Sequence, residues 1–209
     1  MSIILKFNEN VCVFCKFDKN SPFVFKKIQE IIHDKLPQIR LEHVGSSAIG
    51  VGGKGIIDVL VVSSPQKYKL VSKKLILLGF QKDLVKKTKR KTILFQGAIK
   101  YRNKKYYIHC HMTNSNSSDY YNMINFRDRL LKSKTLLKEY AKIKNEAIGK
   151  GKFENCDYNA HKQPFIRKIL TMNKPPHNEF FTFLNNSKTP LFTNNRGFFI
   201  LNKGAFVCK

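Results

Sequence analysis

The chain has 209 residues, of which 42% are hydrophobic, so its composition is that of a globular protein with one ordinary domain and a core of its own. It carries 39 basic and 14 acidic residues. The net charge of +25 favours partners such as nucleotides or nucleic acid, unless it only forms a solvated basic face. No apolar run approaches the roughly 20 residues of a membrane helix, and the first residues do not resemble a secretory signal. We therefore expect a soluble, cytoplasmic protein with no membrane partner.

The first half of the chain alternates between helix and strand patterns. The predicted elements are a helix over 22–35, a strand over 39–44, a loop over 45–55 and a strand over 56–62. Ser21 is predicted to be the N-cap of the first helix, with Pro22 at its first helical position. The loop is rich in glycine, so its backbone can approach a ligand closely. The second strand is apolar except for Asp58, which is the pattern of a buried central strand.

The second half predicts more strands and then mostly helices. The elements expected are a helix over 65–78, strands over 80–84, 92–99 and 105–113, and helices over 119–131, 133–148 and 158–172. Gly79 closes the first of these helices, a basic connection spans 86–91, and a turn lies near 101–103. We expect one domain over 1–172 and a loosely ordered extension, rich in Phe and Asn, over 173–209.

The five cysteines do not form a disulfide or zinc pattern. Their number is odd and their spacing irregular, which fits a reducing compartment. Cys12 and Cys15 form a single CxxC pair, but a zinc ribbon needs a second pair at similar spacing, and the sequence has none. We expect ordinary, partly buried cysteines.

The chemistry is concentrated in the glycine-rich loop and the strand after it. Gly45 permits a tight turn, and Ser46 and Ser47 offer hydroxyl and backbone N–H donors that could hold phosphates. A buried carboxylate such as Asp58 is costly unless it is paired or bound to a cation, and Mg²⁺ carrying phosphates is one such partner. The alternative is an Asp58 hydrogen-bonded to nearby backbone. Lys54 either neutralises phosphate or is one more solvated lysine.

A histidine pair follows in a later strand. His109 and His111 alternate with Cys110, so both imidazoles face the same side of the strand. Together with Asp58 they could bind a divalent metal or contact phosphate. The alternative is a polar cleft whose histidines are hydrogen-bonded and free of metal.

Several linked motifs carry a resemblance to a known family. The segment 42–48 reads EHVGSSA, 54–59 reads KGIIDV, 107–112 reads YIHCHM, 126–130 reads FRDRL, 140–144 reads YAKIK and 162–166 reads KQPFI. Their order and spacing over about residues 17 to 172 resemble the GrpB-like family, which is similar to the nucleotidyltransferase superfamily. The resemblance implies an α/β (α+β) fold, with a nucleotidyltransferase-like mixed β-sheet flanked by helices and further helices at the C-terminal end.

The resemblance also implies the roles of the site residues. Catalytic roles fall on Asp58, His109 and His111, and nucleotide binding falls on Gly45, Ser46, Ser47 and Lys54. In the superfamily, two carboxylates hold two Mg²⁺ ions for nucleotidyl transfer. Residues 58 and 60 face the same side of a strand, but Leu60 stands where the second carboxylate is expected. The metal ligands would then be Asp58, with Glu42 or His111 in compensation.

Three functions remain open from the sequence. The first is a metal-dependent nucleotidyltransferase with an unknown acceptor. The second is a catalytically degenerate module that binds a nucleotide or RNA without turnover, which the loss of a carboxylate at Leu60 and the charge of +25 favour. The third is an accessory domain in coenzyme A metabolism, which rests only on family members fused to dephospho-coenzyme-A kinase.

Overall fold

The computed structural model of the protein describes residues 3–7, 14–83, 92–148 and 155–172. It also describes the backbone of two short antiparallel strands, β6 (Phe192–Thr193) and β7 (Phe199–Ile200). The chain divides into two units, Met1–Leu170 and Thr171–Lys209, and the candidate site lies within the first. The basic connection over 86–91 and most of the extension over 173–209 lie outside the described residues.

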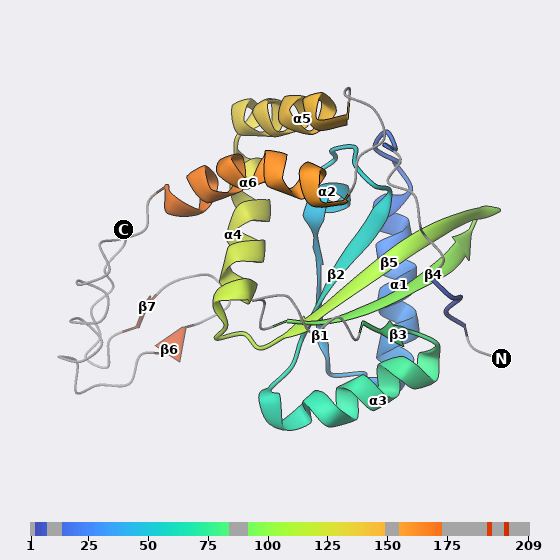
Figure 1. The fold of residues 1–209 in the computed structure, drawn as a ribbon. Helices are drawn as coiled ribbons and strands as arrows, with labels where there is room; N and C mark the ends of the chain where they lie inside the picture. Colours follow the sequence, from blue (N-terminus) through green and yellow to red (C-terminus); the bar gives the residue numbers. More distant parts are fainter. Residues whose placement is uncertain are drawn as a thin grey trace. The chain divides into compact units, whose positions relative to one another are not determined.

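The first unit is built on a five-stranded mixed sheet with the order β1-β2-β5-β4-β3 (Figure 1). The strands are β1 (Arg40–Val44), β2 (Ile56–Val62), β3 (Gln81–Lys82), β4 (Ile93–Tyr101) and β5 (Lys104–Thr113). Neighbours β2 and β5 run parallel, and the other neighbours run antiparallel. β4 and β5 form a hairpin whose two turn residues, Arg102 and Asn103, both have positive φ, as a two-residue hairpin turn of type I′ requires.

Helices lie on both faces of this sheet. They are α1 (Ser21–Lys35), α2 (Gly45–Ala48), the 3₁₀ turn η1 (Pro65–Lys67), α3 (Tyr68–Leu78), α4 (Ser118–Lys132), α5 (Lys134–Ile148) and α6 (Asn155–Thr171). The main core joins one sheet face to α1 and α3 through residues such as Ile28 of α1, Leu75 of α3 and Val59 of β2. The helices α4, α5 and α6 lie together, away from α1 and α3 (Figure 1). None of the described helices is long and apolar enough to cross a membrane.

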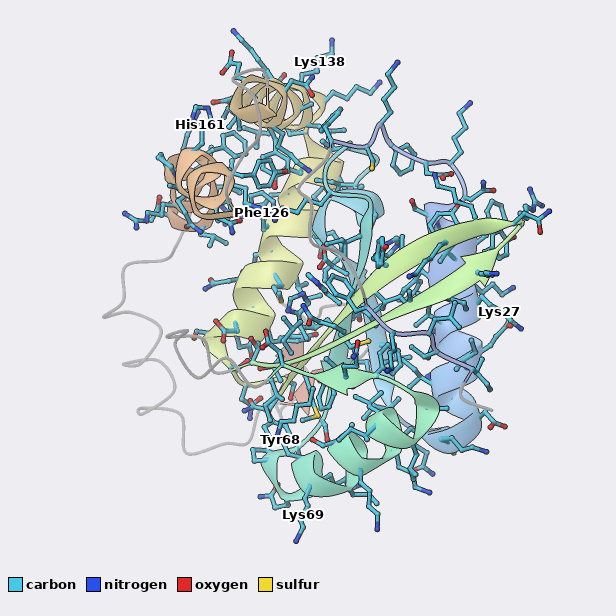
Figure 2. The ribbon with its side chains drawn as sticks, turned by 45° about the vertical axis from the view of Figure 1, so that its right-hand side comes forward. Lys27, Tyr68, Lys69, Phe126, Lys138 and His161 are labelled. Carbon is cyan, nitrogen blue, oxygen red and sulfur yellow. The ribbon has the colours of Figure 1, made fainter. Side chains whose placement is uncertain are left out.

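A second core joins α4, α5 and α6 to the glycine-rich loop. Tyr140 of α5 stacks on Phe165 of α6 with ring centroids 5.4 Å apart, and the Phe126 ring of α4 meets the Tyr140 ring edge-on at 5.2 Å. Figure 2 shows Phe126 on the side of α4 that faces the other two helices. Ile49 and Val51 of the loop are buried in the same cluster. This packing holds α5 and α6 beside the Gly-Ser turn, which is what places their lysines at the site.

The predicted elements are present, several with slightly different bounds, such as α6, which begins at Asn155 rather than at residue 158. There are three further differences. Gly45–Ala48 forms one turn of helix where a loop is predicted, and the Ser46 carbonyl closes its C-terminal end by accepting hydrogen bonds from the backbone of Ile49 and Val51. A single turn carries no apolar period that a sequence could display. Ser21 is the first residue of α1 rather than its cap, and Asn20 holds the cap position. The strand predicted over 80–84 is only two residues long.

Candidate functional site

The site lies on the sheet face opposite the main core. In the parallel register Asp58 of β2 pairs with His109 of β5, and strand alternation places His111 on the same face. Further along β2, Leu60 on this face is buried by α4. A cleft of about 530 Å³ opens on this face. Its lining includes Asp58 and both histidines from the sheet, and side chains of α4, α5 and α6.

Asp58, His109 and His111 form a compact cluster. The His111 Nε2 atom lies 3.1 Å from Asp58 Oδ1, and the His109 Nδ1 atom lies 3.7 Å from the same oxygen. Burial raises the pKa of Asp58, but the hydrogen bond from His111 and the charges of both histidines and Lys162 outweigh it, so the net pKa is lowered. Burial lowers the pKa of His109 more than Asp58 raises it. The cluster therefore combines a carboxylate with a neutral imidazole at His109 at neutral pH.

Gly45 is required by the carboxylate beside it. Its φ is +71°, in the left-handed region that favours glycine. A Cβ atom at this position would overlap the Asp58 carboxylate. The backbone that begins the Gly-Ser turn therefore lies directly against Asp58, and Ser46 lines the cleft next to it. The turn and the carboxylate form one structural unit, as their association in the sequence motif predicts.

Ser47, which was also predicted to bind nucleotide, is hydrogen-bonded to His43. Its hydroxyl lies 3.0 Å from the His43 Nε2 atom, and the His43 ring stacks on Phe25 of α1 at 4.7 Å. Burial lowers the pKa of His43 to about 4, despite the opposing effect of Asp58, so this imidazole is neutral. The His43–Ser47 pair ties the helical turn α2 to α1 on the far side of the sheet. Of the two serines, Ser46 is the one that lines the main cleft.

Three lysines converge on the cleft from different elements. Lys54, which was predicted, comes from the loop, and Lys144 and Lys162 come from α5 and α6. The Lys54 and Lys162 ammonium groups lie 5.5 and 4.6 Å from the centre of the Tyr158 ring. Lys144 and Lys162 are residues that our site prediction missed. The signal for Lys144 is its position in α5, four residues after Tyr140 and three before Ala147, on the apolar stripe.

Lys144 is the most unusual of the three because it is only 2% exposed. No hydrogen bond or ion pair joins its amine to another described residue; the amine lies 5.3 Å from the centre of the Tyr140 ring. The amine and the Ser46 hydroxyl lie 2.6 and 2.9 Å from the point where a Cβ on Gly53 would stand. Burial, together with the charge of Lys162, lowers the pKa of Lys144 to about 7, against a smaller opposing effect of Asp58.

Glu42 does not join the cluster. It pairs with Leu60 in the β1–β2 register, further along the sheet than Asp58. One carboxylate oxygen accepts a hydrogen bond from Arg127 Nη1 at 2.9 Å, and the other accepts two from Arg40. Burial raises the pKa of Glu42, but the two arginines outweigh it and the net pKa is lowered. The structure thus gives Glu42 the role of anchoring Arg127 of α4 to β1, and we do not propose it as a metal ligand.

This anchor predicts a difference between two arginines that share one partner. Arg127 is 18% exposed and also donates to the His43 carbonyl, so Arg127→Met leaves Glu42 and that carbonyl short of donors. We expect the free energy of unfolding to fall by about 2–3 kcal/mol. Arg40 is 58% exposed, and we expect Arg40→Met to cost about 1 kcal/mol or less. Urea unfolding of both variants measures this, and equal losses would contradict the assigned role.

The cluster does not fit the two Mg²⁺ ions that the resemblance implies. Two shared magnesium ions need two carboxylates, and among the described residues Asp58 is the one carboxylate in the group, beside two imidazoles. Leu60 occupies the second position and is fully buried with Val44. Asp119 lines the cleft but is not a member of the group. The part of the chain that the structure describes therefore lacks the ligands of a two-magnesium centre.

The chain is similar in sequence and in structure to proteins that are already known. A UPF0157 protein of Vibrio cholerae is 26% identical over 148 residues, which cover 70% of this chain and 74% of that protein. The crystal structure of the conserved protein GrpB from Enterococcus faecalis superposes with a TM-score of 0.62 at 18% identity, over 75% of this chain and 94% of the other. The non-canonical poly(A) polymerase complex GLD-2–GLD-3 gives a lower TM-score of 0.48 at 14% identity, over 66% and 48% of the two chains.

The fold class is the one expected, an α/β (α+β) mixed sheet flanked by helices, with α4, α5 and α6 at the C-terminal end of the first unit. The family model described as GrpB protein matches residues 13–172, which is well over half of the chain. The chain therefore belongs to the GrpB family.

Proposed function

We propose that the chain binds a nucleoside triphosphate in this cleft and transfers its nucleotidyl group to a hydroxyl acceptor. The observation that carries the proposal is Lys144, a side chain only 2% exposed whose amine opens onto the cleft close to the Ser46 hydroxyl and pairs with no described residue. A buried ammonium group is costly unless an anion compensates it. A phosphate oxygen between Lys144 and Ser46 would be that anion.

The other groups of the cleft fit the same ligand. Lys54 and Lys162 add positive charge, so three lysines face a polyphosphate that carries several negative charges. The Gly45 turn brings backbone close to Asp58, so phosphates held by the turn would lie next to the carboxylate cluster. A cleft of about 530 Å³ is of the size that a nucleotide-sized ligand needs.

The transfer reaction that we propose is a single displacement. The acceptor hydroxyl oxygen attacks the α-phosphorus, the bond from that phosphorus to the bridging oxygen breaks, and pyrophosphate leaves. The lysines neutralise the charge that develops on the pyrophosphate. The acceptor approaches from the side of Asp58, His109 and His111, and this cluster receives the hydroxyl proton. The products are the nucleotidylated acceptor, pyrophosphate and one proton.

An Asp58→Asn variant tests the proposal. The chain is incubated with each of the four nucleoside triphosphates labelled at the α-phosphate, and with an RNA oligonucleotide or the chain itself as acceptor. We expect the wild type to transfer label and release pyrophosphate, and Asp58→Asn to lose at least about a hundredfold in rate, since it removes the charge at the centre of the cluster. The control Asp34→Asn removes an exposed charge of α1 and keeps full activity. Full activity in Asp58→Asn would reject the mechanism.

A second function is favoured by one specific feature, the burial of Leu60 at the second carboxylate position. A member that lost this carboxylate could bind a nucleotide or RNA without turnover. Lys27, Lys69 and Lys138 point outward from three different helices (Figure 2), so the positive charge is spread over the surface rather than confined to the cleft. Nucleotide or RNA binding that weakens steeply with salt, without any transfer of label, would select this function. A cytoplasmic location fits either function and stays a prediction.

A further inference from the structure

We propose that Asp58, His109 and His111 form a binding site for one first-row transition metal ion, such as Zn²⁺, Mn²⁺ or Co²⁺, rather than for Mg²⁺. The inference goes beyond the proposed function, because the metal would bind whether or not a nucleotide is present. It differs from the site that the resemblance implies, in which Asp58 with Glu42 or His111 holds Mg²⁺. It makes specific the alternative that the sequence left open, a divalent metal held by Asp58, His109 and His111.

The distances within the cluster match a shared ion. Metal bonds to histidine nitrogen and carboxylate oxygen are about 2.0–2.2 Å long, so two ligand atoms on one ion stand about 3–3.5 Å apart. His111 Nε2 and Asp58 Oδ1 are 3.1 Å apart, and His109 Nδ1 is 3.7 Å from the same oxygen. All three ligand atoms lie within 4.8 Å of one another. Small shifts of these side chains would complete the site.

Hydrogen bonding explains why His111 lies next to Asp58, but not why His109 does. At 3.1 Å the His111–Asp58 contact is an ordinary hydrogen bond, but at 3.7 Å His109 is too far from Asp58 to donate one. His109 has another neighbour, since its Nε2 atom lies 3.4 Å from the side-chain nitrogen of Gln96. A partner at Nε2 that fixes the ring and leaves Nδ1 for the metal is the usual outer support of a metal-binding histidine. If the Gln96 amide is turned so that its oxygen faces His109 Nε2, that oxygen accepts a hydrogen bond from the ring N–H.

The chemistry of the ligands selects the ion. Imidazole nitrogen suits zinc and the other late first-row metals, whereas Mg²⁺ prefers oxygen ligands in an octahedron. The lysines of the cleft oppose a cation that is held only by charge, because the cluster contains a single carboxylate against Lys54, Lys144 and Lys162. Coordinate bonds from two imidazoles would outweigh the repulsion between the lysines and the cation. Three protein ligands would leave one coordination position of the ion open, as in catalytic metal sites.

Calorimetric titration with Zn²⁺, Co²⁺ and Mg²⁺, without nucleotide, tests the proposal. The protein carries Cys12→Ser and Cys15→Ser, so that the CxxC pair cannot bind metal. We expect one Co²⁺ or Zn²⁺ per chain, bound at least about a hundredfold more tightly than Mg²⁺. His109→Ala and His111→Ala are each expected to weaken Co²⁺ binding at least about tenfold. The electronic spectrum of bound Co²⁺ should change in both variants.

The matched control is His161→Gln, which changes an exposed histidine of α6 and should leave Co²⁺ affinity and spectrum unchanged. The proposal is overturned if Mg²⁺ binds as tightly as Co²⁺, if no metal binds, or if the His109 and His111 variants keep the affinity of the parent protein. Nucleotide binding is measured separately in the presence of a chelator. If nucleotide binds but Co²⁺ does not, the metal-site proposal has failed. If Co²⁺ binds but nucleotide does not, the proposed function has failed.

Discussion

Lys144→Met is expected to weaken nucleotide binding about 10- to 100-fold and, at the same time, to raise the melting temperature of the protein. The loss of affinity corresponds to one hydrogen bond from a charged group, about 1.5–3 kcal/mol. The gain in stability follows because the substitution removes a buried amine that has no partner among the described residues and leaves a side chain of similar length. Each kcal/mol gained raises the melting temperature of a chain of this size by about 2–4 °C.

Both effects depend on pH, because burial lowers the pKa of Lys144. Its pKa is about 7 in the folded protein against an ordinary value of 10.5, so between these values the unfolded chain binds more protons. The cost of burying this amine is therefore full below pH 7 and disappears as the pH rises toward 10.5. The stability advantage of Lys144→Met should shrink over the same range. The affinity of the wild type for nucleotide should fall between about pH 7 and 9, because Lys144 loses its positive charge in this range. The phosphate charge stays constant over the same range, because its second ionisation lies near pH 6.

The control is Lys142→Met, which changes a lysine on the same helix whose side chain is 78% exposed. Neither its affinity nor its melting temperature should differ from the wild type by more than the error of the measurement. Isothermal titration with a nucleoside triphosphate at about pH 7 and pH 9, and thermal melts at the same values, measure all of these quantities. A Lys144→Met variant that is more stable but binds nucleotide with unchanged affinity would show that the amine does not contact the phosphates.

The sequence predicts the fold well because its signals are local. The apolar run interrupted only by Asp58 predicts β2, and the alternation of His109, Cys110 and His111 correctly predicts that both imidazoles share a face. What the sequence does not contain is the register between strands. The pairing of Asp58 with His109 across the parallel β2–β5 ladder depends on packing against helices from distant parts of the chain. That pairing is what turns three separate polar residues into one cluster.

The residues that sequence reasoning assigned incompletely are those whose partners depend on how the chain folds. Glu42 precedes the Gly-Ser turn by only three positions, yet its carboxylate is held by Arg127, 85 residues further along the chain. Ser47 is adjacent to Ser46, but the helical turn α2 directs it to His43. Lys144 belongs to a helix that lies far along the chain from every predicted site residue, and only the packing of α5 on the loop brings it to Ser46.

Gly45→Ala is expected to cost about 2–5 kcal/mol of stability and to abolish both metal binding and nucleotidyl transfer. The alanine would hold a φ of +71°, which costs a non-glycine residue about 1–2 kcal/mol. Its Cβ would also overlap the Asp58 carboxylate, and an overpacked contact costs about 1–3 kcal/mol more. Asp58 must then move away from His109 and His111. Urea unfolding, Co²⁺ titration and the transfer assay measure the three losses.

Gly50→Ala separates the two causes, because Gly50 has nearly the same φ, +74°, but no atom lies within 4 Å of the added Cβ. It should show the backbone cost alone, about 1–2 kcal/mol, and keep metal affinity. A double-mutant cycle then identifies the contact itself. If Asp58 is the group displaced, Gly45→Ala should cost less in an Asp58→Ala background than in the wild type, by about 1 kcal/mol or more. Equal costs in the two backgrounds would mean that the turn is strained for reasons unrelated to the carboxylate, and that its closeness to Asp58 does not explain why glycine begins the turn.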